Sequence, residues 1–204
     1  MRVLVLAAHP DDETFGCGGA IARFPQAKHK VYVLWFGGGR VEGTQARKLD
    51  KVRKLLRIAD ARLMDFPDNE FDARPLIKLI TSIDESITVW KPDLILTHTI
   101  HDANQDHREV HQATLVAMRV REGRPVPDVW AYSVAGSVMP EFQPRLFVPC
   151  GHEAKDAAMD CYADELHLLP YPTTREAIYD QMMVWGSQVG RACAEAFEVI
   201  RSVR

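Results

Sequence analysis

Two clusters of histidine and carboxylate residues stand out in the sequence, because both residue types are common metal ligands. One is the segment HPDDE that starts at His9, and the other is the segment HTIHDANQDH that ends at His107. A catalytic zinc keeps three protein ligands and an open position for water, whose pKa the metal lowers to about 7. His9, Asp12 and His107 would make such a ligand set, and Asp11 is the natural base for the bound water.

Each cluster taken alone also has a simpler interpretation. A histidine after a strand is commonly an ordinary loop residue. Asp is a favoured helix N-cap, so Asp11 or Asp12 could instead cap a helix that starts near Thr14 or Phe15. Packing in a core explains the clusters poorly if both lie at the ends of central strands. The placement of the strands therefore decides between these interpretations.

Apolar runs and helical spacing of apolar residues alternate along the whole chain. Such runs are typical of strands covered on both faces, and spacing of three and four residues is typical of amphipathic helices. We predict strands over residues 2–8, 31–36, 61–66, 93–98 and 129–134, with others at 145–148 and in the C-terminal AFEVIRSV. We predict helices after the HPDDE segment and over residues 43–59, 76–89, 106–120, 153–165 and 173–192.

This alternation predicts an α/β fold, a Rossmann-like three-layer sandwich with a mainly parallel central sheet. If the strand order is 3-2-1-4-5, the first and fourth strands are neighbours at a topological switch point. Ligands of open α/β sheets bind outside the carboxyl ends of the strands at such a point. The two clusters follow these two strands, so we expect them to meet there.

The composition is that of an ordinary globular protein. The 204 residues suit one domain (1–204), and 47% hydrophobic with 26% charged residues exclude disordered, collagen-like and coiled-coil chains. A formal net charge of −3 argues against nucleic acid as a partner. No apolar run approaches the roughly 20 residues of a membrane span. The N-terminal apolar stretch is too short for a signal peptide, so we expect a cytoplasmic protein with four free cysteines.

The glycines after the first strand raise a different hypothesis, a dinucleotide-dependent enzyme. Gly16 and Gly18 have the first spacing of the G-x-G-x-x-G fingerprint, but Ile21 takes the place of the third glycine. The acidic HPDDE segment would also repel a pyrophosphate. We therefore interpret these glycines as allowing close packing of a helix on the sheet.

The HPDDE segment after an N-terminal strand, together with D-x-N-x-D-H after a later strand, resembles the PIG-L/LmbE-like family of zinc-dependent N-deacetylases. The resemblance spans the chain and includes FPDNEFD, CYADE, YPTTRE and GSQVGRACAEAFEVIR. It implies that His9, Asp12 and His107 bind Zn²⁺ and that Asp11 is the general base. Whether another divalent metal replaces zinc stays open.

The resemblance also implies roles in binding substrate. Arg47 matches an arginine that would hold sugar or phosphate oxygens of the substrate, and Asp68 of the PDN segment would lie nearby. Asp106 would orient a neighbouring polar group at the metal site. His111, one helical turn beyond His107, is expected to be structural.

This chain departs from several family members at Asn104, where they carry a histidine proposed to act as an acid or to stabilise the oxyanion. Asn can donate a hydrogen bond but not a proton. The leaving amine would then take its proton from Asp11, or from His98 or His101.

The reaction implied by the resemblance is hydrolysis of the N-acetyl group of a small amino sugar or of an N-acetylglucosamine conjugate, with release of acetate. A zinc amidase that acts on another amide of such a conjugate would use the same site. A non-catalytic binding protein with the same fold is the alternative from another class. The resemblance is also compatible with a homo-oligomer.

Overall fold

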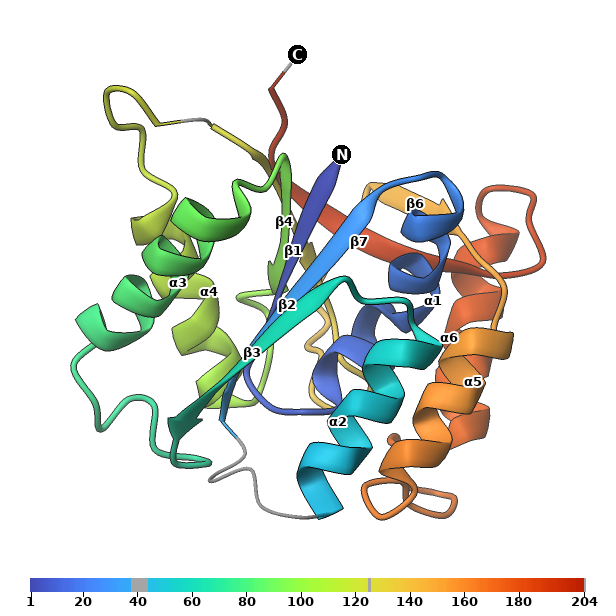
Figure 1. Ribbon diagram of the computed structural model, residues 1–204. Helices are drawn as coiled ribbons and strands as arrows, with labels where there is room; N and C mark the ends of the chain where they lie inside the picture. The colour runs from blue at the N-terminus through green and yellow to red at the C-terminus, as the bar shows by residue number, and fades with distance from the viewer. Residues whose placement is uncertain (38–43, 125, 204) are drawn as a thin grey trace.

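The apolar runs of the sequence form the strands of one central sheet (Figure 1). The computed structural model describes residues 1–37, 44–124 and 126–203, and this part of the chain contains seven strands. They are β1 (Arg2–Ala7), β2 (Lys30–Gly37), β3 (Asp60–Phe66), β4 (Leu94–His98), β5 (Asp128–Tyr132), β6 (Leu146–Pro149) and β7 (Ala194–Arg201).

The strand order is β3-β2-β1-β4-β5-β7-β6. The first five strands of this order are parallel, and β7 pairs antiparallel with both β5 and β6. The predicted order of the parallel strands is therefore confirmed. The C-terminal strand and β6 extend the sheet beyond β5 in the opposite direction.

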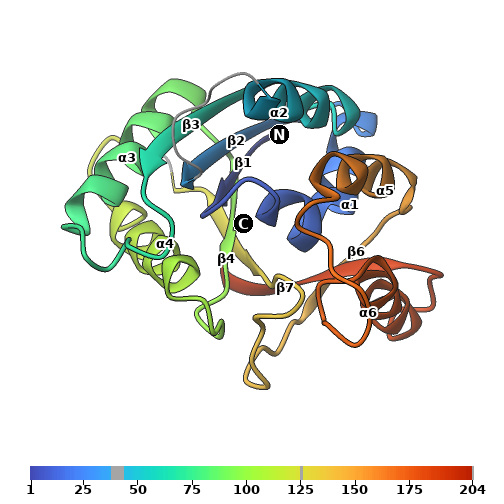
Figure 2. The same ribbon diagram turned by 90° about the horizontal axis from the view of Figure 1, so that it is seen from below.

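Helices cover both faces of the sheet (Figures 1 and 2). Those of the described residues are α1 (Asp12–Gln26), α2 (Thr44–Leu55), α3 (Ile77–Trp90), α4 (Gln105–Ala117), α5 (Glu153–Met159), the 3₁₀ turn η1 (Asp160–Tyr162) and α6 (Arg175–Ser187). One face carries α3 and α4, and the other carries α1, α2, α5 and α6 (Figure 2). The predicted three-layer α/β sandwich is confirmed. Within the described residues, no helix combines the length and apolarity that crossing a membrane requires.

The central strand β1 explains why the strands read as unbroken apolar runs. Alternate side chains of a strand point to opposite faces of the sheet. Val3 and Val5 therefore pack into the core under α1, whereas Leu4 and Leu6 pack into the core under α3 and α4. Because both faces are covered by helices, every residue from Val3 to Ala8 is buried.

Four predicted helices are shorter in the structure. The helix predicted over 106–120 is α4, which ends at Ala117. The helix predicted over 43–59 is α2, which ends at Leu55, and residue 43 lies outside the described part of the chain. The helix predicted over 153–165 ends at Met159 and continues only as η1. The helix predicted over 173–192 begins at Arg175, because the Thr174 hydroxyl accepts the Ala177 amide as an N-cap, and it ends at Ser187.

Candidate active site

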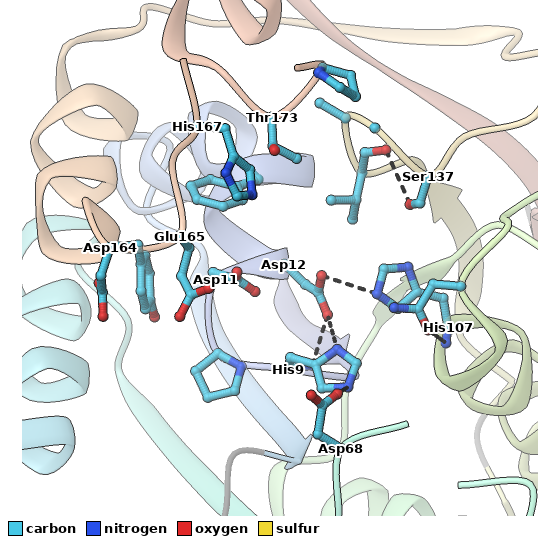
Figure 3. A pocket seen from close by; sticks show the side chains of 18 of the residues that line it. His9, Asp11, Asp12, Asp68, His107, Ser137, Asp164, Glu165, His167 and Thr173 are labelled. Atoms are coloured by element: carbon cyan, nitrogen blue, oxygen red, sulfur yellow. Dashed lines mark hydrogen bonds and ion pairs between the residues drawn. The ribbon is translucent and has the colours of Figure 1, made fainter. Parts of the chain in front are cut away.

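The two predicted clusters meet where β1 and β4 end side by side. Asp12 lies in the first turn of α1, and His107 lies in the first turn of α4. Nε2 of His107 is 3.2 Å from Oδ1 of Asp12, and Nδ1 of His9 is 3.5 Å from Oδ2 of the same carboxylate. The three side chains turn toward one another (Figure 3), and their potential ligand atoms lie within 4.8 Å of each other. The three side chains form a group that could hold a metal ion.

Each of the two histidines is held by a carboxylate at the ring nitrogen that points away from Asp12. Nδ1 of His107 lies 2.9 Å from Oδ2 of Asp102, which is completely buried and also accepts the Asn104 amide. Nε2 of His9 lies 3.1 Å from Oδ2 of Asp106. A carboxylate on the outer nitrogen fixes the tautomer and the ring orientation of a metal-binding histidine. Both imidazoles are therefore oriented toward the same point.

Asp106 has the orienting position that the resemblance implies. Besides His9, it accepts the backbone amides of Asn69 and Phe71, at 2.8 and 3.1 Å. Asp68 also reaches Nε2 of His9, at 3.0 Å, although its side chain is two-thirds exposed. The loop that follows β3 is thereby attached to the His9 side of the centre.

The electrostatics of this centre favour a cation. Burial alone would lower the pKa of His9 and of His107, but hydrogen bonds and charges of Asp106, Asp12 and Asp102 outweigh it and raise each pKa to about 10. Burial would raise the pKa of Asp12, yet the imidazoles of His107, His98 and His9 beside it, through charge and hydrogen bonds, keep that pKa well below its usual value. The donor set and the surplus of negative charge both fit a divalent metal such as Zn²⁺.

Asp11 faces away from the metal ligands and toward a cavity. Its backbone has φ 127° and ψ −35°, in a region that non-glycine residues rarely adopt. It occupies the N-cap position of α1, but in the described structure its side chain makes no capping hydrogen bond. The alternative in which Asp11 merely caps the helix is therefore wrong. Burial and the nearby charges of Asp12 and Glu13 raise the pKa of Asp11.

The cavity has a volume of about 1110 Å³, and the metal centre forms one wall of it. Figure 3 shows Asp11 and Glu165 on the same side of this cavity as Asp12, with Ser137 and Thr173 on another side. The described residues that line it are 9–12 with Phe15, 67–69, 134–137, seven residues between Tyr162 and Thr173, and Gln45, Lys48, Asn104 and His107.

Asn104 lies at the cavity, as expected, and it also starts α4. Its Oδ1 accepts the backbone amides of Asp106 and His107, at 2.9 and 3.4 Å. A side-chain oxygen at this position is a standard N-cap. The amide nitrogen of Asn104 stays available to a molecule in the cavity.

The structure does not support His98 or His101 as proton donors. His98 is completely buried under His107, with 3.9 Å between the two ring centroids, and its Nε2 accepts the Ala8 amide. Burial and the charge of His107 lower the pKa of His98 to about 4, so it is neutral near pH 7. His101 is absent from the described cavity wall. His111 has the structural role expected for it, because its buried ring bonds the His98 carbonyl.

Arg47 is exposed and is absent from the described lining of the cavity, whereas the next residue, Lys48, lines it. Nζ of Lys48 bonds both oxygens of Asp164, at 2.7 and 2.9 Å. Lys48 and Asp102 were not among the predicted site residues. Asp102 is the first residue of the D-x-N-x-D-H pattern, which is its local signal, whereas the rotation of α2 that directs Lys48 to the cavity has none.

The lining by residues 162–173 was also missed, although CYADE and YPTTRE were recognised as part of the resemblance. The glycines after β1 were interpreted correctly as packing sites. A Cβ atom on Gly16 would lie 2.4 Å from the Tyr132 ring of β5, and one on Gly19 would lie 2.6 Å from Sγ of Cys150. Side chains at these positions would push α1 off the sheet.

Comparison with known proteins agrees with this site. Residues 4–118, more than half of the chain and including both clusters, match the family model PIG-L, described as GlcNAc-PI de-N-acetylase. The uncharacterized deacetylase YaiS of Escherichia coli K12 is 28% identical over 155 residues, which are 71% of this chain and 80% of YaiS.

Two solved structures share the fold. The conserved protein TT1542 of Thermus thermophilus has a TM-score of 0.84 at 20% identity, over 99% of this chain and 95% of that one. The N,N'-diacetylchitobiose deacetylase of Pyrococcus horikoshii has a TM-score of 0.78 at 16% identity, over 98% of this chain and 83% of that one. Because the family model matches more than half of the chain, we conclude that the chain belongs to the PIG-L family of deacetylases and is a hydrolytic enzyme.

Proposed function

We propose that this protein is a zinc-dependent hydrolase that removes the N-acetyl group of an amino-sugar conjugate and releases acetate. The observation that carries the proposal is the placement of Asp11. Its carboxyl group is turned into the cavity, directly beside a ligand set of two histidines and Asp12 that are oriented by carboxylates. A metal-dependent amide hydrolase uses this combination of a base and a metal site on one wall of a substrate cavity.

His9, Asp12 and His107 would hold the metal. Bound Zn²⁺ would lower the pKa of a water molecule and polarise the acetamide oxygen. Asp11 takes the proton from this water, whose oxygen adds to the carbonyl carbon. The carbon–nitrogen bond then breaks, and Asp11 returns the proton to the amine nitrogen, so that a free amine and acetic acid leave, and the acid ionises to acetate in water. Asn104 can donate its amide hydrogen to the substrate oxygen as negative charge develops.

The cavity supports a substrate larger than one sugar. Its volume of about 1110 Å³ is slightly above the range for drug-sized ligands, which is roughly 300–1,000 Å³. Lys48 is the only lysine among the described lining residues, which include no arginine, and its charge is already paired with Asp164. Asp68 and Glu165 add negative charge. These features favour an uncharged amino-sugar conjugate, as in the chitobiose-type substrate of the Pyrococcus relative, over a phosphorylated one.

The proposal is tested with the zinc-loaded protein and a panel of N-acetylglucosamine compounds: the free sugar, its disaccharide, and phosphate-, lipid- and thiol-linked forms. Released acetate and new primary amine are measured together, and we expect equal amounts of both. Faster cleavage of a bulkier acyl group would favour the amidase. Tight zinc binding without cleavage of any compound would favour the non-catalytic binding protein.

The carboxylate behind His107 gives a prediction on metal affinity. Replacing Asp102 by Asn is expected to weaken zinc binding by roughly 10–100-fold, the range seen when the outer partner of a metal-bound histidine is lost. Competition with a chromophoric chelator measures the change. Asp160→Asn, which removes an exposed partner of Arg175 outside the described cavity wall, is the control and should bind zinc as the wild type does. Equal affinity of Asp102→Asn and the control would contradict the assignment.

Zinc binding is also expected to release protons. Without metal, His9 and His107 have pKa values of about 10, so both are protonated at pH 7, and both must lose a proton to become ligands. The affinity should therefore rise with pH by about two orders of magnitude per pH unit between pH 6 and 8, and fall as the pH is lowered. Titration calorimetry in buffers of different ionisation enthalpy counts the protons. His101→Ala should leave the count unchanged, and a count near zero would refute the prediction.

A further inference from the structure

Glu13, the last residue of HPDDE, is completely buried and is absent from the described wall of the cavity. Its carboxylate accepts four hydrogen bonds. Oε2 accepts the Asp11 amide at 3.1 Å and the Trp35 indole at 2.7 Å, and Oε1 accepts the hydroxyls of Thr14 at 2.7 Å and Tyr162 at 3.1 Å. One side chain therefore joins the proposed base to β2 and to η1.

The Asp11 backbone needs such support. A non-glycine residue with φ 127° persists only where the surrounding structure holds it, and such residues gather at functional sites. This conformation lets two consecutive carboxylates diverge, so that Asp12 reaches the histidines while Asp11 enters the cavity (Figure 3). The Asp11 amide, directed at Glu13, is part of the same local arrangement.

Two other partners of Glu13, Trp35 and Tyr162, are buried. Trp35 is 2% exposed within β2, the direct neighbour of β1, which leads into His9. Tyr162 is 1% exposed and its ring packs edge-on against Phe15. Because hydrogen bonds from Trp35 and Tyr162 fix the position of the Glu13 carboxylate, its hydrogen bond to the Asp11 amide restrains the Asp11 backbone as well.

We propose that Glu13 is a positioning residue that holds Asp11 in the geometry for taking a proton from water, and this rests on the hydrolytic function proposed above. Glu13 acts purely as a hydrogen-bond acceptor. It exchanges no proton with the substrate, because the described cavity does not reach it.

The four groups that donate to Glu13 differ in whether they can also accept a hydrogen bond, and this difference allows a role as acceptor to be tested by substitution. The Asp11 amide and the Trp35 indole can only donate, whereas the Thr14 and Tyr162 hydroxyls can donate or accept. A glutamine can therefore present its oxygen to the first pair and its NH₂ group to the hydroxyls. Glu13→Gln should preserve the arrangement, and Glu13→Met, similar in size but without an acceptor oxygen, should lose it.

The test compares these two variants in the zinc-loaded protein. Glu13→Met is expected to lower kcat by roughly 100-fold, the effect of a misplacement of about 1 Å, with KM and zinc content close to those of the wild type. Glu13→Gln is expected to keep kcat within about threefold, with an unchanged pH–rate profile. Thr114→Val, which removes a buried hydroxyl that bonds Thr97, controls for lost stability and should keep the wild-type kcat.

Two results would overturn the proposal. One is an equal loss of kcat in Glu13→Gln and Glu13→Met, which would indicate a role for the charge or the proton of Glu13. The other is a normal kcat in Glu13→Met. Crystal structures give a readout that does not depend on activity: Asp11 should keep its positive φ in Glu13→Gln and leave it in Glu13→Met. An inactive wild type would refute the proposed function alone, because this structural comparison would still test the positioning role.

Discussion

Replacing Asp11 by Asn is expected to lower kcat for deacetylation by about 10²–10⁴-fold, the usual contribution of a general base. The asparagine keeps the size of the side chain but cannot take a proton from water. Zinc content should not change, because the ligand set is His9, Asp12 and His107. The measurement is the initial rate of acetate release at saturating substrate, with the metal content of each preparation determined in parallel.

Asp72→Asn is the matched control for this experiment. Asp72 bonds the Gln105 side chain on the surface and is absent from the described cavity wall, so its variant should keep the wild-type kcat. If Asp11→Asn retained more than about a tenth of the wild-type kcat with full zinc occupancy, Asp11 would not be the base. Loss of zinc in Asp11→Asn would instead make Asp11 part of the metal site.

The second large effect is expected on stability, at a break in α1. Cys17 has φ −142° and ψ 23°, which interrupts the helical hydrogen bonds. The buried pair Lys155 and Glu195 satisfies the groups that this break leaves open. Nζ of Lys155 donates to the Phe15 carbonyl at 2.8 Å and to Oε1 of Glu195 at 2.7 Å. The same carboxylate accepts the amides of Gly19 and Ala20, at 2.9 and 2.7 Å.

Lys155→Met is therefore expected to reduce the free energy of unfolding by about 3–5 kcal/mol, because it leaves the buried Glu195 carboxylate without its counter-charge. Urea unfolding of the metal-free protein measures the loss. Lys155→Met combined with Glu195→Gln removes both charges and should recover part of it. Lys48→Met breaks the exposed ion pair with Asp164 and should cost at most about 1 kcal/mol. Equal losses for Lys155→Met and Lys48→Met would contradict this account of the α1 break.

Both predictions concern the start of α1, where the sequence is most informative. The run at residues 2–8 predicts β1 and the HPDDE segment marks its carboxyl end, so the strand order brings this segment to β4 and the second cluster. Apolar periodicity and strand-end placement are local properties that sequence spacing records directly. Fold class, parallel order and the convergence of His9, Asp12 and His107 were therefore predictable.

Other features depended on how the elements pack. The rotation of α2 directs Lys48 rather than Arg47 to the cavity, and the stacking of His98 under His107 removes a predicted acid from the site. Tyr162 reaches Glu13 across 149 positions of the chain. Side-chain direction, burial and long-range hydrogen bonds arise only when helices are seated on the sheet, and no local spacing records them. The sequence by itself thus determined the metal-binding chemistry and its place at the sheet edge, whereas the tertiary structure decided which neighbours orient, bury or support each group.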